Sequence, residues 1–172
     1  MHSKTAVLSF YIWIFLGFAV AAANADEYKA KVVAVSDGDS IMVLHNNSKE
    51  KVILFGIDCP ELKQDYGQQA RQYTDQACFG KTVSVNVHGY DHHGRAIAEI
   101  YLPDGSDLNH ELVRLGFAWW SDKYAPNDNI LKQYHNAAKA NKTGLWAQAN
   151  PIAPWTFRNG EKSVEAVIKP AQ

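Results

Sequence analysis

Cysteine and surplus positive charge are both scarce in this sequence. Two of its 172 residues are cysteines, too few for a scaffold held together by disulfides. The 17 Lys and Arg residues are balanced by 18 Asp and Glu residues, which leaves a formal net charge of −1. This balance argues against a broad grip on nucleic acid through bulk charge, so any phosphate binding must be local. Hydrophobic residues make up 47% of the chain, ample for the core of one domain.

Long apolar runs are also missing, except for one near the N-terminus. That run extends from Ala6 to Ala23, follows the basic residue Lys4, and ends in Ala23-Asn24-Ala25. The pattern predicts that residues 1–25 are a signal peptide cleaved after Ala25, which makes the protein secreted or periplasmic. A retained membrane anchor is the alternative, because the run is nearly long enough to span a bilayer. The lack of a second run excludes a protein with several membrane spans.

Removal of the signal peptide changes the charge and the redox setting of the chain. The mature protein keeps 16 basic and 18 acidic residues, a formal charge of −2. Outside the cytoplasm Ca²⁺ can be plentiful and disulfides can form. Cys59 and Cys78 either pair with each other or remain two unpaired thiols, and the sequence leaves both possibilities open.

The rest of the chain alternates between short strands and helices. Apolar alternation predicts a strand over residues 29–35, with Ala30, Val32 and Ala34 on one face, and Gly38 is free to take a positive φ in the turn that follows. The same reasoning predicts strands over 41–45, 51–57, 82–87 and 95–102. Helices are expected over 68–79, over 109–115, and from a cap at Asn127 or Asp128 to residue 143.

Short antiparallel strands interleaved with three helices indicate an α+β fold. We expect a five-stranded Greek-key β-barrel of the OB type, with the three helices packed on it, over residues 26–150. Residues 151–172 are expected to form a C-terminal extension that is ordered around Trp155 and partly disordered beyond it.

Three short motifs carry side chains suited to chemistry. They are Asp37-Gly38-Asp39 in a hairpin turn, Asp58-Cys59-Pro60-Glu61 after the third strand, and Gly94-Arg95 where a turn enters a strand. Carboxylates at two loop ends of one barrel face suit a hard cation such as Ca²⁺. The alternative is structural: an aspartate in a turn often bonds its own backbone, and Glu61 and Arg95 could be solvated surface charges.

With further motifs in the same order, this pattern resembles the staphylococcal nuclease-like (thermonuclease-like) family. The motifs are Asp37-Gly38-Asp39-Ser40, Gly56-Ile57-Asp58-Cys59-Pro60-Glu61, Tyr66-Gly67, Asp91-x-x-Gly94-Arg95, Asn109-x-x-Leu112-Val113-x-x-Gly116-x-Ala118, Lys123-Tyr124-Ala125-Pro126 and Gly144-Leu145-Trp146. Each motif is short, but seven follow in order, and the resemblance covers about Tyr28 to Trp146.

The resemblance implies a Ca²⁺-dependent phosphodiesterase that acts on DNA and RNA. It assigns the metal to Asp39, Asp58 and the main-chain oxygen of Cys59, with Asp37 as a more distant carboxylate. A carbonyl ligand is indifferent to its own side chain, so a cysteine at this position is compatible with the role.

For catalysis the resemblance points to Glu61 and Arg95. Glu61 matches the general base for the attacking water, and Arg95 matches an arginine that clamps the scissile phosphate. The residue types suit these tasks, because a carboxylate can accept a proton from water and a guanidinium binds phosphate oxygens bidentately. A dication and a guanidinium together offset the charge that builds on the phosphoryl oxygens.

One expected basic residue is absent. Where the family carries a second phosphate-binding arginine, this chain has Ile53. Lys51 lies two residues earlier on the same strand face and is our first candidate to supply the missing charge. Lys63 and Arg71 are the other candidates.

Several further residues are candidates for substrate binding. His92 and His93 stand in a turn where they could bind phosphate, or could simply be polar turn residues. A transition-metal site that includes His88 is a weaker alternative. Tyr124 could contact a base or could pack within its loop, and one of the two tryptophans before it should belong to the core.

Taken together, the sequence predicts an exported, monomeric, Ca²⁺-dependent nuclease for DNA and/or RNA, with no stable protein partner. Contact with a membrane is expected only if the N-terminal segment is retained. The alternative is an OB-fold module with impaired catalysis that binds nucleic acid or another polyanion, in which Ile53 marks lost chemistry.

Overall fold

The computed structural model describes residues 26–160 of the chain. The predicted signal peptide over residues 1–25 lies outside the described residues, and so does the end of the predicted C-terminal extension from residue 161 onward.

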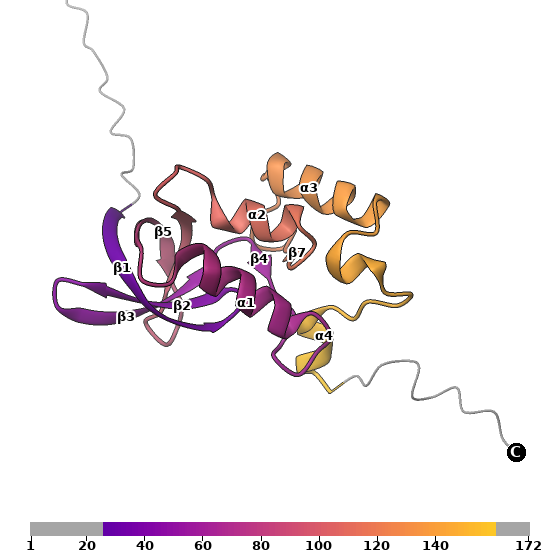
Figure 1. The fold of residues 1–172 in the computed structure, drawn as a ribbon, viewed down its shortest axis with the longest axis horizontal. Coiled ribbons are helices and arrows are strands. Elements are labelled where there is room, and N and C mark those ends of the chain that lie inside the picture. The colour runs from indigo at the N-terminus through magenta and orange to yellow at the C-terminus, as the bar shows by residue number, and fades with distance from the viewer. Residues whose placement is uncertain (1–25, 161–172) are drawn as a thin grey trace, which may run out of the picture.

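Five strands close into a barrel in the order β1-β2-β3-β6-β5, with β5 pairing back onto β1 (Figure 1). They are β1 (Asp26–Asp37), β2 (Ser40–His45), β3 (Ser48–Leu54), β5 (Thr82–Tyr90) and β6 (Ala96–Tyr101). The predicted five-stranded barrel with packed helices is confirmed. One pair departs from the antiparallel expectation: β3 and β6 run parallel, with Val52 opposite Ala96. The segment between these two strands contains a helix and β5, which supplies the crossover that a parallel pair needs.

Two strands differ from their predicted form. In β1 a bulge between Val32 and Ala34 breaks the alternation, so that Val35 is buried while Ala34 is exposed. The strand predicted over 51–57 stops at Leu54, because Gly56 turns the chain with a φ of 73°. The next residues form the short strand β4 (Ile57–Asp58), which pairs with β7 (Trp119–Trp120) in a separate two-stranded sheet. This turn carries Asp58 out of the barrel wall.

The three predicted helices are present as α1 (Gly67–Cys78), α2 (Leu108–Arg114) and α3 (Asn129–Ala140). Asp128 caps α3, since its carboxylate accepts the backbone N–H groups of Ile130 and Leu131. The helix ends three residues earlier than predicted, and Lys142 then takes a φ of 53°. Two further elements were not predicted: the 3₁₀ turn η1 (Gly144–Ala147) and the helix α4 (Pro154–Arg158). Within residues 26–160, no helix combines the length and apolar character that a membrane span requires.

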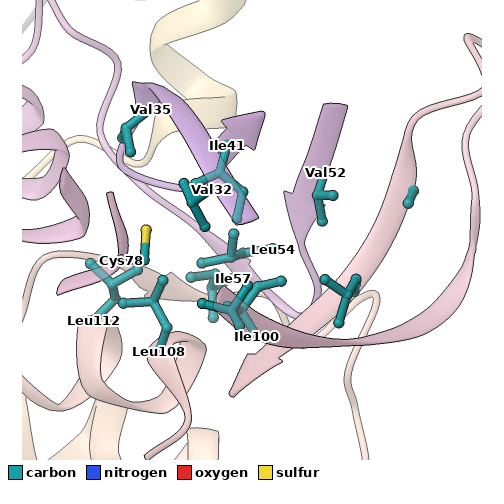
Figure 2. Packing of buried hydrophobic residues seen from close by; sticks show 14 of the residues in the cluster. Val32, Val35, Ile41, Val52, Leu54, Ile57, Cys78, Ile100, Leu108 and Leu112 are labelled. Atoms are coloured by element: carbon teal, nitrogen blue, oxygen red, sulfur yellow. The ribbon is translucent and has the colours of Figure 1, made fainter. Parts of the chain in front are cut away.

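The barrel interior is packed with aliphatic side chains, and α2 closes one end of it. Figure 2 shows Leu108 and Leu112 of α2 against the strand residues, and both are fully buried. Between them, Asn109 accepts the backbone N–H of Ile100 at 3.2 Å and donates to the carbonyl of Phe55 at 2.9 Å. Because Phe55 lies in the turn that leads to β4, this buried amide fixes the point at which the chain leaves the barrel.

A second, smaller cluster surrounds His135 on α3. The ring is partly buried beside Trp120 and Trp146, and its Nδ1 lies 3.4 Å from the backbone N–H of Trp120. Burial, with a smaller effect from Lys139, lowers the pKa of His135 to about 4. The ring is therefore neutral at pH 7, and Nδ1 can act as an acceptor.

The partly buried His135 should make the fold sensitive to acid. An unfolded histidine titrates near pH 6.5, so between pH 6.5 and 4 the unfolded chain binds more protons and stability falls as the pH falls. Replacing His135 with asparagine, which keeps a hydrogen-bond acceptor, should lessen this acid-induced loss of unfolding free energy by about 1–2 kcal/mol. The figure allows for solvent screening, because the ring is partly exposed. Urea unfolding of His135→Asn at pH 7.5 and pH 4.5 measures it. The exposed-site control His92→Asn should keep the wild-type pH dependence, and identical dependence in His135→Asn would contradict the assignment.

Candidate active site

The first two predicted motifs meet at one end of the barrel. A side-chain oxygen of Asp39, in the turn between β1 and β2, accepts the backbone N–H of Cys59, just after β4. The carbonyl of the same aspartate accepts the N–H of Leu54 at 2.9 Å. These bonds bring together the three residues predicted to hold a metal, Asp39, Asp58 and Cys59, although 20 positions separate the first from the last.

Gly38 allows this close approach. Its carbonyl accepts the hydroxyl of Thr74 on α1 at 2.6 Å. A Cβ built on Gly38 would lie 2.7 Å from the sulfur of Cys59 and 2.8 Å from the Cβ of Ala70. The expectation of a positive φ at this glycine is wrong, because its φ lies outside the left-handed region. Glycine is needed here because any side chain would collide with Cys59 and Ala70.

The carboxylates of the site are close enough to perturb one another. Burial and then the charge of Asp37 raise the pKa of Asp39 well above its usual value. Burial also raises the pKa of Asp58, an effect that Arg158 partly opposes. Such a group of acidic side chains is stable as anions only with a compensating positive charge nearby.

Both cysteines are buried and unpaired. Burial raises the pKa of the Cys59 thiol well above its usual range, and it raises that of Cys78 to about 12. The sulfur of Cys78 donates to the carbonyl of Thr74 at 3.0 Å. The structure therefore favours two protonated thiols over a disulfide, and it leaves the main-chain oxygen of Cys59 as the group that this residue could offer to a cation.

The donor atoms fit a hard cation that keeps part of its water shell. Within residues 26–160, no three His, Cys, Asp or Glu side chains form a ready-made metal cluster. Two carboxylates and a carbonyl form a smaller, all-oxygen set, and Ca²⁺ accepts backbone carbonyls and water as its remaining ligands. The residue types at Asp39, Asp58 and Cys59 are therefore compatible with Ca²⁺.

Glu61 lies in the loop after β4 and is held at both its backbone and its side chain. Its N–H donates to the side-chain oxygen of Gln64 at 2.8 Å. Its carboxylate accepts Nη1 of Arg158 at 2.8 Å, and the same guanidinium bonds both carboxylate oxygens of Asp58, at 3.1 and 2.7 Å. The sequence analysis missed Arg158 and Gln64. No local pattern indicates Arg158, which follows Glu61 by 97 residues.

Arg95 lies immediately before β6 and bonds the carboxylate of Asp91. Although burial opposes it, donation from the backbone and side chain of Arg95 and from the N–H of His93 lowers the pKa of Asp91 to about 2. Among the described residues Arg95 makes no hydrogen bond or ion pair with Asp39, Asp58 or Glu61. Its side chain is 37% exposed and thus accessible to a substrate.

The parallel pairing of β3 and β6 puts the outward residues of these strands beside one another. Val52 and its partner Ala96 are buried, so Lys51 and Arg95, one position earlier, lie on the outer side of the barrel. Ile53 lies on the same side of β3. The structure is thus consistent with a position of Lys51 near Arg95. Arg71, another candidate for the missing charge, instead donates a hydrogen bond from Nε to the carbonyl of Val35 at 3.3 Å.

The remaining candidates lie at the surface or in the packing. His92 and His93 are exposed in their turn, with ring centroids 3.9 Å apart. Tyr124 is 65% exposed, and the ammonium of Lys123 lies 5.0 Å from its ring centroid. His88 stacks on a phenylalanine and lies 3.2 Å from the carboxylate of Glu99. These contacts, and not a metal site, account for the position of its ring.

Both tryptophans of β7 are partly buried. Trp119 packs on Trp146, with ring centroids 4.4 Å apart, and Trp120 donates to the carbonyl of Ala125 at 3.0 Å. Packing therefore holds both tryptophans in place, whereas the sequence analysis expected only one of them to belong to the core.

An open groove of about 450 Å³ runs between the loop that carries Glu61 and the C-terminal segment. Residues from both sides line it, among them Pro60, Lys63, Gln64, Trp119, Ile152 and Phe157. Lys63, one of the candidates for the missing positive charge, is thus among the residues that line this groove.

Enlarging Gly38 should damage the site. The added methyl of Gly38→Ala must displace Cys59 or Ala70, which costs about 1–3 kcal/mol of stability by overpacking. The matched control is Gly89→Ala, because a Cβ there meets open space. Urea unfolding of both variants measures the difference. Equal stability of the two would show that the turn has more room than the geometry indicates.

Comparisons with known proteins identify the family of this chain. The family model described as "Staphylococcal nuclease homologue" matches residues 51–148. An Escherichia coli O157:H7 protein named an uncharacterized endonuclease is 39% identical over 129 residues, which cover 75% of this chain and 84% of that protein. A Haemophilus influenzae protein of the same name is 32% identical over 163 residues (94% and 89%). The micrococcal nuclease of Shigella flexneri is 32% identical over 146 residues (80% and 84%). This chain therefore belongs to the staphylococcal nuclease family.

Proposed function

We propose that this protein is an exported, Ca²⁺-dependent nuclease that hydrolyses phosphodiester bonds in DNA and/or RNA. Nuclease activity is supported by the family and by relatives that are named endonuclease and micrococcal nuclease. The cofactor, the export and the roles of individual residues are our proposals.

The observation that carries the proposal is the junction of the two acidic motifs through the Asp39–Cys59 hydrogen bond. It collects all-oxygen donors and a separate carboxylate, Glu61, at one end of the barrel. We assign the cation to Asp39, Asp58 and the carbonyl of Cys59. A bound Ca²⁺ would supply positive charge next to the phosphoryl oxygens of a substrate.

Glu61 is assigned as the general base. Its carboxylate is partly exposed, and its backbone N–H is fixed by Gln64. A carboxylate oxygen in this position can accept the proton of the attacking water. Arg95 is assigned to the phosphate, where its planar fork would stabilise the charge that develops on the nonbridging oxygens.

Residues around this centre would guide the nucleic acid. Lys51 precedes Val52 on the outward side of β3, at the end of the strand pair where Arg95 precedes Ala96, and offers a further positive charge. We assign His92 and His93 to the backbone of the substrate and Tyr124 to stacking on a base, since all three are exposed.

Cleavage of single-stranded DNA and RNA by the mature chain tests the function. We expect cleavage with Ca²⁺ and none with a chelator, and a loss of about 10²–10⁴ in rate for Glu61→Gln. Glu111→Gln is the matched control, because Glu111 also pairs with an arginine but lies on α2. Binding without cleavage by the wild type would instead support a polyanion-binding module. Cleavage that persists in chelator or in Glu61→Gln would contradict the proposed mechanism.

A further inference from the structure

The C-terminal segment brings a guanidinium onto the acidic side chains of the site. Arg158 on α4 donates to both carboxylate oxygens of Asp58 and to Glu61, at distances from 2.7 to 3.1 Å. Its side chain is 49% exposed, so a ligand can reach it from solvent. The hydrogen bonds to Asp58 and Glu61 raise the pKa of Arg158 above its usual value, and it stays charged at any working pH.

Packing and backbone contacts hold α4 in this place independently of the ion pairs. Gln64 accepts the N–H of Glu61 through one side-chain atom and donates to the carbonyl of Ile152 at 3.1 Å through the other. Trp155 packs edge-on against Trp119 of β7, with ring centroids 5.5 Å apart. The segment before α4 is therefore bound to the same loop that carries the candidate base, and Figure 1 shows α4 beside the loop that precedes α1.

Because Arg158 contacts Glu61, it also lies within reach of the place where water activated by Glu61 would attack a phosphate. A water that Glu61 deprotonates is about 2.6–3.2 Å from its carboxylate, and the phosphorus under attack is about 3–3.5 Å beyond the water. The guanidinium already touches Glu61, so a small side-chain movement brings its fork to a phosphoryl oxygen. Guanidinium binds phosphate oxygens in the same bidentate way as it binds the carboxylate of Asp58.

We propose that Arg158 binds the scissile phosphodiester and acts with Arg95 as the second guanidinium of the site. In the substrate-free chain Arg158 pairs with Asp58 and Glu61. When the substrate binds, its phosphate replaces these carboxylates as the partner of the guanidinium. The positive charge that the outer face of β3 lacks at Ile53 thus comes from the C-terminal helix. This inference deepens the proposed nuclease function and rests on it for the chemical step.

A purely inhibitory role for Arg158 predicts the opposite result. If the ion pairs only neutralised Asp58 and Glu61 and kept a cation away, removal of Arg158 would strengthen Ca²⁺ binding and accelerate cleavage. Binding and rate measurements on the same variants therefore separate the two roles.

The test compares Arg158→Ala and Arg158→Lys with the wild-type mature chain. Arg114→Ala is the matched control, because Arg114 also pairs with a glutamate and is 46% exposed, but lies on α2. Circular dichroism and a thermal unfolding midpoint for each variant establish that it is folded. A failure of Arg158→Ala to fold leaves Arg158→Lys to decide, since lysine keeps the charge and loses the fork.

Cleavage of a single-stranded DNA oligonucleotide with saturating Ca²⁺ is the first measurement. We expect kcat/KM to fall by about 10²-fold in Arg158→Ala and by less in Arg158→Lys, with Arg114→Ala unchanged. An unchanged or increased rate in folded Arg158→Ala would overturn the proposal.

Binding of the same oligonucleotide with Ca²⁺, in a Glu61→Gln background that slows cleavage, is the second measurement. Arg158→Ala should weaken the affinity about tenfold and reduce the slope of log affinity against log salt by about 0.7, the value for one lost phosphate contact on a single strand. Calorimetry should show Ca²⁺ affinity that is not weakened. Unchanged oligonucleotide affinity would overturn the proposal. If the wild type never cleaves, the nuclease function fails, while this binding result still decides whether Arg158 holds a phosphodiester.

Discussion

The hydrogen bond from the backbone N–H of Cys59 to the carboxylate of Asp39 is the contact on which the site depends. It joins a hairpin turn of the barrel to the segment after β4, a part of the chain that has already left the barrel wall. Gly38 makes the approach sterically possible, and the hydroxyl of Thr74 on α1 fixes the turn by donating a hydrogen bond to the carbonyl of Gly38. Without this junction Asp39 would be separated from Asp58 and Glu61, and the donors that we assign to the cation would not meet.

The fold keeps this junction in place through buried polar contacts as well as apolar packing. Asn109 of α2 bonds Phe55 in the turn between β3 and β4, and so fixes the exit of the chain from the barrel. An unsatisfied amide in that position would be costly, which ties the geometry of the site to the intact core. The acidic side chains add electrostatic strain of their own, because burial and neighbouring like charges raise the pKa values of Asp39 and Asp58. Positive charge is therefore a structural as well as a chemical requirement, and Arg158 provides part of it.

Much of the fold could be predicted from local pattern. Alternation of apolar residues indicated the barrel strands, and a cap at Asn127 or Asp128 indicated the start of α3. The failures have local physical causes: a bulge inverted the alternation after Val32, and Gly56 interrupted what looked like a single strand. The parallel pairing of β3 with β6 depends on a long crossover, which no window of sequence shows.

The sequence by itself determined which residue types are available and where the acidic motifs lie: carboxylates at Asp39, Asp58 and Glu61, and an apolar residue at Ile53. Those features follow from motif order and spacing, which are properties of short segments. Only the tertiary structure decided that the C-terminal helix returns to the site and puts Arg158 on Asp58 and Glu61. The reason is physical. The ion pairs join positions about a hundred residues apart, and they form because Gln64 and Trp119 hold the last segment against the loop after β4.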